Sequence, residues 1–386
     1  MLLLPGIAVC ISLQAQKPKT GKLLNRSAKQ VAFMLSQLDS AKANGSAPGL
    51  ISPRTRENGK LKIVRGQDWT SGFFPGILWY LYQHTRDETW RKQANVYTMA
   101  LKPIQYFGGT HDLGFIMYCS FGNGYRLTSD TSYRSVIIQS AKTLAGRYNP
   151  VAGVIKSWDF ASESKWKYPV IIDNMMNLEL LFEATRLTKD SSFYRIAISH
   201  ADKTIVNHYR SDYSSFHVVD YDPSDGHVRQ RITAQGYKDS SAWARGQAWG
   251  LYGFTMTYRE TGIRKYLQQA EQVAEYILRR QPAGKIPFWD YDAPGIPDEP
   301  LDVSAACITA SALYELYQHT RNKTYLHAGD KLLNAVVKSS LSPLYQNNGF
   351  VLLHSTGHKP ANSEVDVPLV YADYYFIEAL IRRENL

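Results

Sequence analysis

Apolar residues recur along most of the chain at a spacing of three or four positions. One such stripe consists of Leu267, Ala270, Val273, Ala274, Ile277 and Leu278. This spacing is that of the buried face of an α-helix, whereas a strand would alternate apolar and polar residues. An alternating pattern is largely absent, so the chain is predicted to be all-α.

The helical segments repeat. LYQHTRDETW (81–90) and LYQHTRNKTY (316–325) are near copies, and looser versions occupy 125–141, 184–201 and 258–274. Each contains a helix end, a Thr or Ser, a polar turn, an aromatic residue and a second helix. Residues of this kind stop one helix and cap the next. Each unit is therefore predicted to be a helical hairpin.

Five joints of this kind lie near residues 85, 128, 188, 261 and 320. A final helix near Tyr371–Arg383 would complete a sixth pair. Repeated hairpins that bury each other's faces form a solenoid or a closed ring. We expect one α/α toroid of six hairpins over residues 25–386. A split into two domains near residue 150 is the alternative, but no linker-like composition supports it.

Gly- and Pro-rich segments interrupt the helices at 102–124, 208–240, 284–304 and 344–368. Loops of this length on a repeat scaffold are usually functional or disordered. We expect them at the mouth of the toroid.

The first sixteen residues, MLLLPGIAVCISLQAQ, are apolar, uncharged and short. They resemble the apolar part of a signal peptide that ends at Ala15, although an ordinary N-terminus is the alternative. The residues before Cys10 make a poor lipid-attachment site. The stretch is too short to span a bilayer, and no later run of 18 apolar residues follows. These features predict export, most simply to a periplasm.

Composition narrows the class further. The chain has 386 residues, of which 44% are hydrophobic and 20% charged, which excludes a disordered or fibrous protein. Three Cys residues, at 10, 119 and 307, lack the spacing of a disulfide framework or a zinc site. A net charge of +10 suggests an anionic partner, but no basic block indicates nucleic-acid binding.

Two acidic residues stand in unusual surroundings. Asp173 follows Val170, Ile171 and Ile172 at the start of an apolar segment. Poor solvation raises the pKa of a carboxyl and suits it to general-acid chemistry. Asp112, in HDLGF, is the second candidate. The alternatives are a helix cap for Asp173 and a turn residue for Asp112. A pair of carboxylates is typical of sugar hydrolysis.

The segment AQGYKDSSAWARGQAWGLYGF (234–254) sets large planar side chains among Ala and Gly. Gln235 begins it, Arg245 could clamp a carboxylate through two hydrogen bonds, and Trp243 and Trp249 could stack on sugar rings. The alternative is close helix packing with buried Trp side chains. Further candidates are Trp69, Trp158, His217 and Lys359, each of which has an ordinary structural interpretation as well.

Several segments, in this order, resemble glycoside hydrolase family 88, the unsaturated glucuronyl hydrolases. They are DWTSGFFPGILWYLYQHT, HDLGFIMYCSFG, VIIDNMMNLELL, QGYKDSSAWARGQAWGLYGF and LHSTGHKPANSEVDVPLVYADYYFIEAL. The resemblance implies an (α/α)6 barrel without a metal or organic cofactor. It also implies a substrate class, oligosaccharides that polysaccharide lyases leave with a 4,5-unsaturated uronate at the non-reducing end.

By this resemblance, Asp173 is the general acid/base and Asp112 its essential partner. Asp173 would protonate C4 of the vinyl ether, and water would then attack C5. The matching pocket positions are His111, Trp158, His217, Gln235, Trp243, Arg245 and Trp249. Lys359 matches a loop that contacts sulfated substrates. The expected partners are unsaturated glycosaminoglycan di- and oligosaccharides.

Two other functions remain open from the sequence. An unsaturated rhamnogalacturonyl hydrolase would share the barrel and the chemistry but act on pectin fragments. A non-catalytic toroid that binds polyanions would keep the basic charge and the Trp residues without needing either carboxylate.

Overall fold

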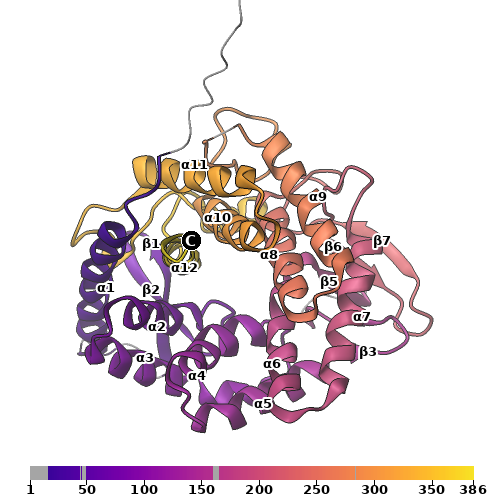
Figure 1. Cartoon of the computed structure of the whole chain (residues 1–386), viewed down its shortest axis with the longest axis horizontal. Helices are drawn as coiled ribbons and strands as arrows, with labels where there is room; N and C mark the ends of the chain where they lie inside the picture. Colours follow the sequence, from indigo (N-terminus) through magenta and orange to yellow (C-terminus); the bar gives the residue numbers. More distant parts are fainter. Residues whose placement is uncertain (1–15, 44, 46–48, 160–164, 283) are drawn as a thin grey trace, which may run out of the picture.

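The computed structural model describes residues 16–386, apart from 44, 46–48, 160–164 and 283. The expected signal segment at 1–16 therefore lies outside the described residues, except for residue 16. Helices dominate the fold (Figure 1). They are α1 (Thr20–Ala43), α2 (Phe73–Thr85), α3 (Glu88–Ala100), α4 (Asn123–Thr128), α5 (Ser132–Ala145), α6 (Leu178–Thr188), α7 (Ser191–His208), α8 (Ala244–Thr261), α9 (Arg264–Arg280), α10 (Val303–Thr320), α11 (Lys323–Ser340) and α12 (Val370–Glu384).

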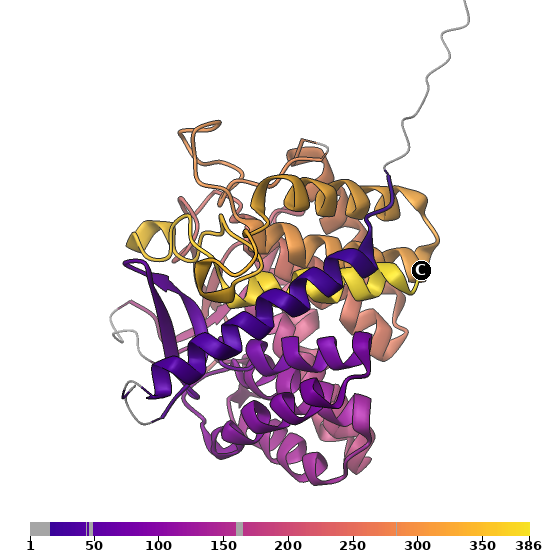
Figure 2. The same cartoon turned by 90° about the vertical axis from the view of Figure 1, so that its left-hand side faces the viewer.

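The helices form two concentric rings (Figure 1). Helices α2, α4, α6, α8, α10 and α12 make the inner ring, and α3, α5, α7, α9, α11 and α1 surround it. A π-helix, Gly114–Gly122, extends α4, and a 3-10 helix, Ile172–Asn177, precedes α6. Helix α12 packs against both α2 and α10, which closes the inner ring, and α1 packs against α12. The predicted (α/α)6 barrel is confirmed, and α1 and α12, from the two ends of the chain, form its sixth helix pair (Figure 2).

The joints between inner and outer helices share one local structure, as their repeated sequence predicts. The residue after the inner helix is left-handed in all five: Arg86, Ser129, Lys189, Gly262 and Arg321. At the first joint the hydroxyl of Thr85 accepts the N–H of Asp87 at 3.2 Å, and the Asp87 carboxylate accepts the N–H of Thr89 at 2.8 Å. A side chain in this position satisfies a free N–H at the start of the next helix.

Short strands lie in the inserts between the hairpins. They are β1 (Leu50–Glu57), β2 (Lys60–Arg65), β3 (Tyr148–Asn149), β4 (Val154–Ile155), β5 (Tyr168–Ile171), β6 (Val218–Tyr221) and β7 (Val228–Ile232). Strands β1 and β2 form a hairpin, and β5, β6 and β7 form an antiparallel sheet. Strands of two to eight residues are too short to leave a clear alternating pattern in the sequence.

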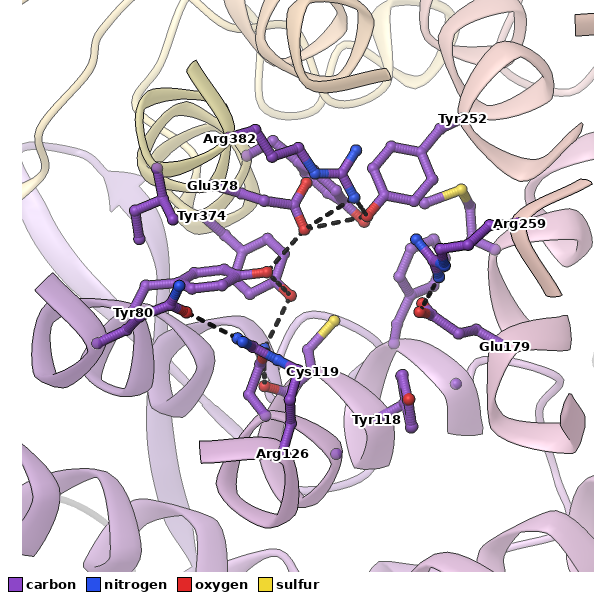
Figure 3. A pocket seen from close by; sticks show the side chains of 18 of the residues that line it. Tyr80, Tyr118, Cys119, Arg126, Glu179, Tyr252, Arg259, Tyr374, Glu378 and Arg382 are labelled. Carbon is purple, nitrogen blue, oxygen red and sulfur yellow. Dashed lines mark hydrogen bonds and ion pairs between the residues drawn. The ribbon is translucent and has the colours of Figure 1, made fainter. Parts of the chain in front are cut away.

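A polar cavity of about 480 Å³ occupies the barrel where the inner helices end (Figure 3). Glu378 of α12 accepts hydrogen bonds there from Tyr80 of α2 at 2.7 Å, Tyr252 of α8 at 3.0 Å and Ser311 of α10 at 2.5 Å. Because each donor belongs to a different inner helix, this one buried carboxylate joins four of the six.

The arginines of this cavity are already engaged. Arg382 pairs with Glu315 at 2.6 Å and donates to Tyr252 at 2.8 Å. Arg259 pairs with Glu315 at 2.7 Å and also with Glu179. Arg259 and Arg382 thus bind carboxylates of neighbouring inner helices and hold the inner ring together (Figure 3), whereas Arg126 donates to Gln83 and Asn123.

Candidate active site

The sequence-predicted site residues gather at the opposite end of the barrel, where the inner helices begin. Asp112 lies two residues before the π-helix, and Asp173 lies in the 3-10 helix between β5 and α6. Arg245 is in the first turn of α8, and the loop 354–368 leads into α12. The inserts therefore surround the end at which the two candidate carboxylates lie.

Asp173 is a buried carboxyl with one oxygen unpaired among the described residues. The residue is 8% exposed, and its Oδ2 has no hydrogen-bond partner in the described part of the chain. Burial raises the pKa of Asp173 to about 7; Arg245 opposes this rise and Asp112 adds to it. The side chain caps neither helix, because Ile171 and Asn177 occupy the two cap positions. The capping interpretation of Asp173 is therefore excluded.

His217 faces this carboxyl as a neutral donor. Its Nδ1 accepts the backbone N–H groups of Ala234 at 3.0 Å and Gln235 at 3.1 Å. Burial holds the pKa of His217 well below its usual value. A neutral ring that accepts at Nδ1 carries its proton on Nε2. That Nε2 lies 3.8 Å from Oδ2 of Asp173, slightly beyond a hydrogen bond.

Asp112 is held by two neighbours. The hydroxyl of Thr110 donates to Oδ2 at 2.6 Å, and Nε2 of His111 lies 3.2 Å from Oδ1. His111 is fully buried, and its burial lowers its pKa. The Asp112 side chain is 15% exposed, so it remains in contact with solvent.

Two residues that the sequence analysis missed tie the carboxylate segments together. Asn177 accepts the N–H of Phe115 through Oδ1 at 3.0 Å. Ser157 accepts the N–H of Ile171 through Oγ at 3.0 Å, and its carbonyl accepts the N–H of His111 at 3.3 Å. These bonds link segments that are far apart in the sequence, so no local pattern could have revealed them.

Arg245 is more committed than the sequence suggested. It is 1% exposed, and Nη1 binds Asp302 at 2.8 Å and the Thr356 carbonyl at 2.5 Å. Nη2 donates to the Gly357 carbonyl at 2.5 Å. Three hydrogen bonds therefore hold the guanidinium to the cap of α10 and to the loop 354–368. We expected the Arg245 guanidinium to be free to bind a substrate carboxylate. Instead it is a buried cation that anchors this loop.

The expected stacking role is wrong for Trp249. Its ring is 0% exposed and packs against Phe115 and Tyr375, with ring centroids 5.1 and 5.4 Å apart. The alternative given above, close helix packing with a buried Trp side chain, is correct for Trp249. Trp243 is 4% exposed and lies against His217 at 4.7 Å and Arg245 at 4.6 Å. Both indoles are therefore buried, and they support the site by packing against its residues.

The remaining candidates lie around the same end. Trp158 is half-buried, 6.0 Å from the His217 ring. Trp69 is half-buried against Tyr371. Gln235 donates to the Gly357 carbonyl at 3.2 Å. Lys359 begins a short 3-10 turn in the loop 354–368.

No three His, Cys, Asp or Glu side chains among the described residues converge into a potential metal site. None of the helices in this part of the chain combines the length and apolar character needed to cross a bilayer.

The family model of Glycosyl Hydrolase Family 88 matches residues 51–380. An unsaturated glucuronyl hydrolase of Formosa agariphila is 48% identical over 84% of this chain and 82% of that protein. An unsaturated chondroitin disaccharide hydrolase of Streptococcus pneumoniae is 31% identical over 86% and 85%. The crystal structure of a heparin-specific unsaturated glucuronyl hydrolase superposes with a TM-score of 0.88, at 41% identity, over 94% of this chain and 97% of that one. With this family match on a barrel that brings Asp112 and Asp173 to one end, the chain belongs to glycosyl hydrolase family 88.

Proposed function

We propose that this enzyme removes the 4,5-unsaturated uronic acid from the non-reducing end of lyase-generated glycosaminoglycan oligosaccharides. The observation that carries the proposal is the buried Asp173 carboxyl, whose pKa is about 7 and whose neighbour is the neutral His217. A carboxyl that keeps its proton near neutral pH can donate it to carbon.

In this mechanism Asp173 donates its proton to C4 of the vinyl ether. Positive charge develops at C5 and the ring oxygen, and water adds at C5 while the ionised Asp173 takes one of its protons. The hemiketal then opens and expels the remaining sugar. The Nε2–H of His217 and the cation of Arg245 both face the carboxylate that forms, so they stabilise it between the two proton transfers.

Asp112 has a different part in this scheme. Its negative charge raises the pKa of Asp173. Asp112 thus keeps the acid protonated before the reaction, and the same charge favours the positive charge that develops on the sugar ring. The hydroxyl of Thr110 and the ring of His111 fix the carboxylate for both tasks.

Two relatives are named for heparin and chondroitin substrates, which favours glycosaminoglycan fragments over pectin fragments for this enzyme. Lyase digests of chondroitin, hyaluronan, heparin and pectin distinguish the substrates through the loss of unsaturated-uronate absorbance. Turnover of any of the first three digests supports the proposal. Turnover of the pectin digest alone would favour the rhamnogalacturonyl alternative, and binding without turnover of any digest would favour the non-catalytic toroid.

The activity should fall as the pH rises through about 7. Only protonated Asp173 can start the reaction, and the fraction that is protonated decreases above its pKa of about 7. The pH dependence of kcat/KM on an unsaturated disaccharide measures this decrease on the alkaline side. A constant kcat/KM from about pH 6 to about pH 9 would contradict the assignment of Asp173 as the acid.

Lys359 is expected to select sulfated substrates. It lies in the loop 354–368 at the active end of the barrel, where its ammonium group could reach a sulfate on the second sugar. Such a charge-assisted hydrogen bond contributes about 1.5–3 kcal/mol. Lys359→Ala should therefore lower kcat/KM by about ten-fold or more on a sulfated disaccharide and leave the matched unsulfated one unchanged. Equal losses on both substrates, or none on either, would exclude this role.

Export belongs to the proposal as well. Its support is the apolar, uncharged sequence of residues 1–16. Expression of the full chain, followed by cell fractionation and N-terminal sequencing, tests it. Processing near Ala15 is the expected result, and an intact chain retained in the cytoplasm would contradict it.

A further inference from the structure

Arg54 of β1 joins two walls of the candidate active site. Its Nε and Nη2 bind Oε1 and Oε2 of Glu364 at 2.5 and 2.9 Å, and its Nη1 binds Oδ2 of Asp68 at 2.7 Å. The Glu364 side chain is 7% exposed, that of Arg54 22% and that of Asp68 19%. A two-pronged Arg–carboxylate pair with this burial fixes both partners in position.

Glu364 belongs to the loop 354–368. Its carbonyl accepts the N–H of Gly357 at 2.6 Å, and the carbonyl of the same Gly357 accepts hydrogen bonds from Arg245 and Gln235. Glu364 has a φ of 55°, a left-handed conformation that is unfavourable for residues other than glycine. A Cβ atom on Gly357 would lie 2.5 Å from Oε2 of Glu364. The ion pair therefore holds the loop in a conformation that the local sequence does not favour.

Asp68 belongs to the turn that carries Trp69. Its Oδ1 accepts the N–H of Thr70 at 2.9 Å and the hydroxyl of Thr70 at 2.6 Å. The Trp69 ring packs on Tyr371 at 4.9 Å, and Tyr371 in turn lies 5.4 Å from the Arg245 guanidinium. Asp68 thus connects Arg54 to the aromatic wall of the site.

We propose that Arg54 is a positioning residue that locks the Trp69 turn to the loop 354–368 and thereby sets the affinity for substrate. Arg54 makes none of the bonds that hold Asp112 or Asp173. The loop and the Trp69 turn flank the site, whereas the proton transfers occur at the carboxylates. Loss of the lock should therefore weaken substrate binding and leave the chemical step intact. The kinetic part of this inference rests on the proposed hydrolase function.

The test compares Arg54→Gln, Glu364→Gln and the double variant with the wild type, using an unsaturated disaccharide. Each single variant should raise KM by roughly ten-fold, because small displacements of binding groups are costly. The kcat should stay within about two-fold. The double variant should be no worse than either single one, since both remove the same interaction. Arg54→Lys, which keeps the charge but not the two-pronged geometry, should be intermediate.

Arg56→Gln is the matched control. Arg56 lies on the same strand, but its guanidinium binds Asn348 at 3.0 Å and Asn347 at 2.7 Å, away from the loop 354–368. This variant should leave KM unchanged.

Amide hydrogen exchange of the peptide 354–368 gives a readout that needs no substrate. The amides of Gly357 and His358 should exchange faster in Arg54→Gln and in Glu364→Gln, but not in Arg56→Gln. Unchanged exchange, an unchanged KM, or a kcat that falls as far as KM rises would each overturn the lock. Faster exchange in these two variants, together with a wild-type enzyme that is inactive on every unsaturated uronide, would instead refute the proposed function and leave the structural lock standing.

Discussion

Asp173→Asn is expected to fold like the wild type and to lose activity by about 10²-fold or more, as expected when a general acid/base is removed. An amide cannot supply the proton to C4 or accept one from water. The fold should tolerate the change, since Oδ2 of Asp173 has no hydrogen-bond partner among the described residues. Steady-state rates and thermal unfolding of the purified variant measure both effects.

Asp190→Asn provides the control for this change. Asp190 caps α7 through the N–H of Ser192 at 2.8 Å, and asparagine caps a helix equally well. This variant should keep full activity. Turnover close to that of the wild type in Asp173→Asn would remove Asp173 from the mechanism.

Asp112→Asn should also lower activity by about 10²-fold, but in a distinguishable way. Asp112 raises the pKa of Asp173, so neutralising it should lower that pKa. Less of the acid is then protonated at neutral pH, and the alkaline limb of the kcat/KM profile should move to lower pH. A higher KM is expected as well, because the Asp112 side chain is partly exposed and can contact the substrate.

The pH profile of Asp112→Asn decides between two roles. A limb that moves to lower pH supports an electrostatic action on Asp173. A large loss of activity with an unmoved limb would mean that Asp112 acts on the substrate alone. Activity within about two-fold of the wild type would contradict both roles.

The helical hairpins could be predicted because their determinants are local. Each joint has a left-handed residue, and at four of the five an Asp or Asn side chain accepts an N–H at the start of the next helix, as at Arg86 and Asp87. Closure of the ring was harder to predict from the sequence. The partner of α12 is α1, which lies at the other end of the chain and shares no joint with it. The short strand before Asp173 was missed because β5 has only four residues.

In the candidate site, too, features with local determinants could be predicted and long-range contacts could not. Asp112 and Asp173 could be selected from their neighbours, because unusual surroundings of a carboxyl are visible in the sequence. The partners of Arg245 could not be predicted in this way, since Asp302 and Thr356 lie 57 and 111 positions away in the sequence. The Ala and Gly residues of 244–254 were compatible with a sugar-binding wall or with close packing.

Close packing explains these glycines. A Cβ on Gly250 would lie 2.0 Å from the hydroxyl of Tyr209, and one on Gly253 would lie 2.5 Å from Cβ of Met175. Helix α8 therefore approaches the 3-10 helix that carries Asp173, and Trp249 is buried as a consequence. The glycines place the catalytic segment, which is a contribution to the site that composition alone does not reveal.

The central claim is that water adds across the C4–C5 double bond and that the glycosidic carbon is not attacked. The most direct test follows the unsaturated-uronate absorbance and the released sugar together, with an unsaturated disaccharide and its saturated counterpart as matched substrates. The mechanism predicts that absorbance disappears in a one-to-one ratio with sugar release, and that the saturated disaccharide is not cleaved. Early sugar release with the absorbance retained, or cleavage of the saturated disaccharide, would contradict it.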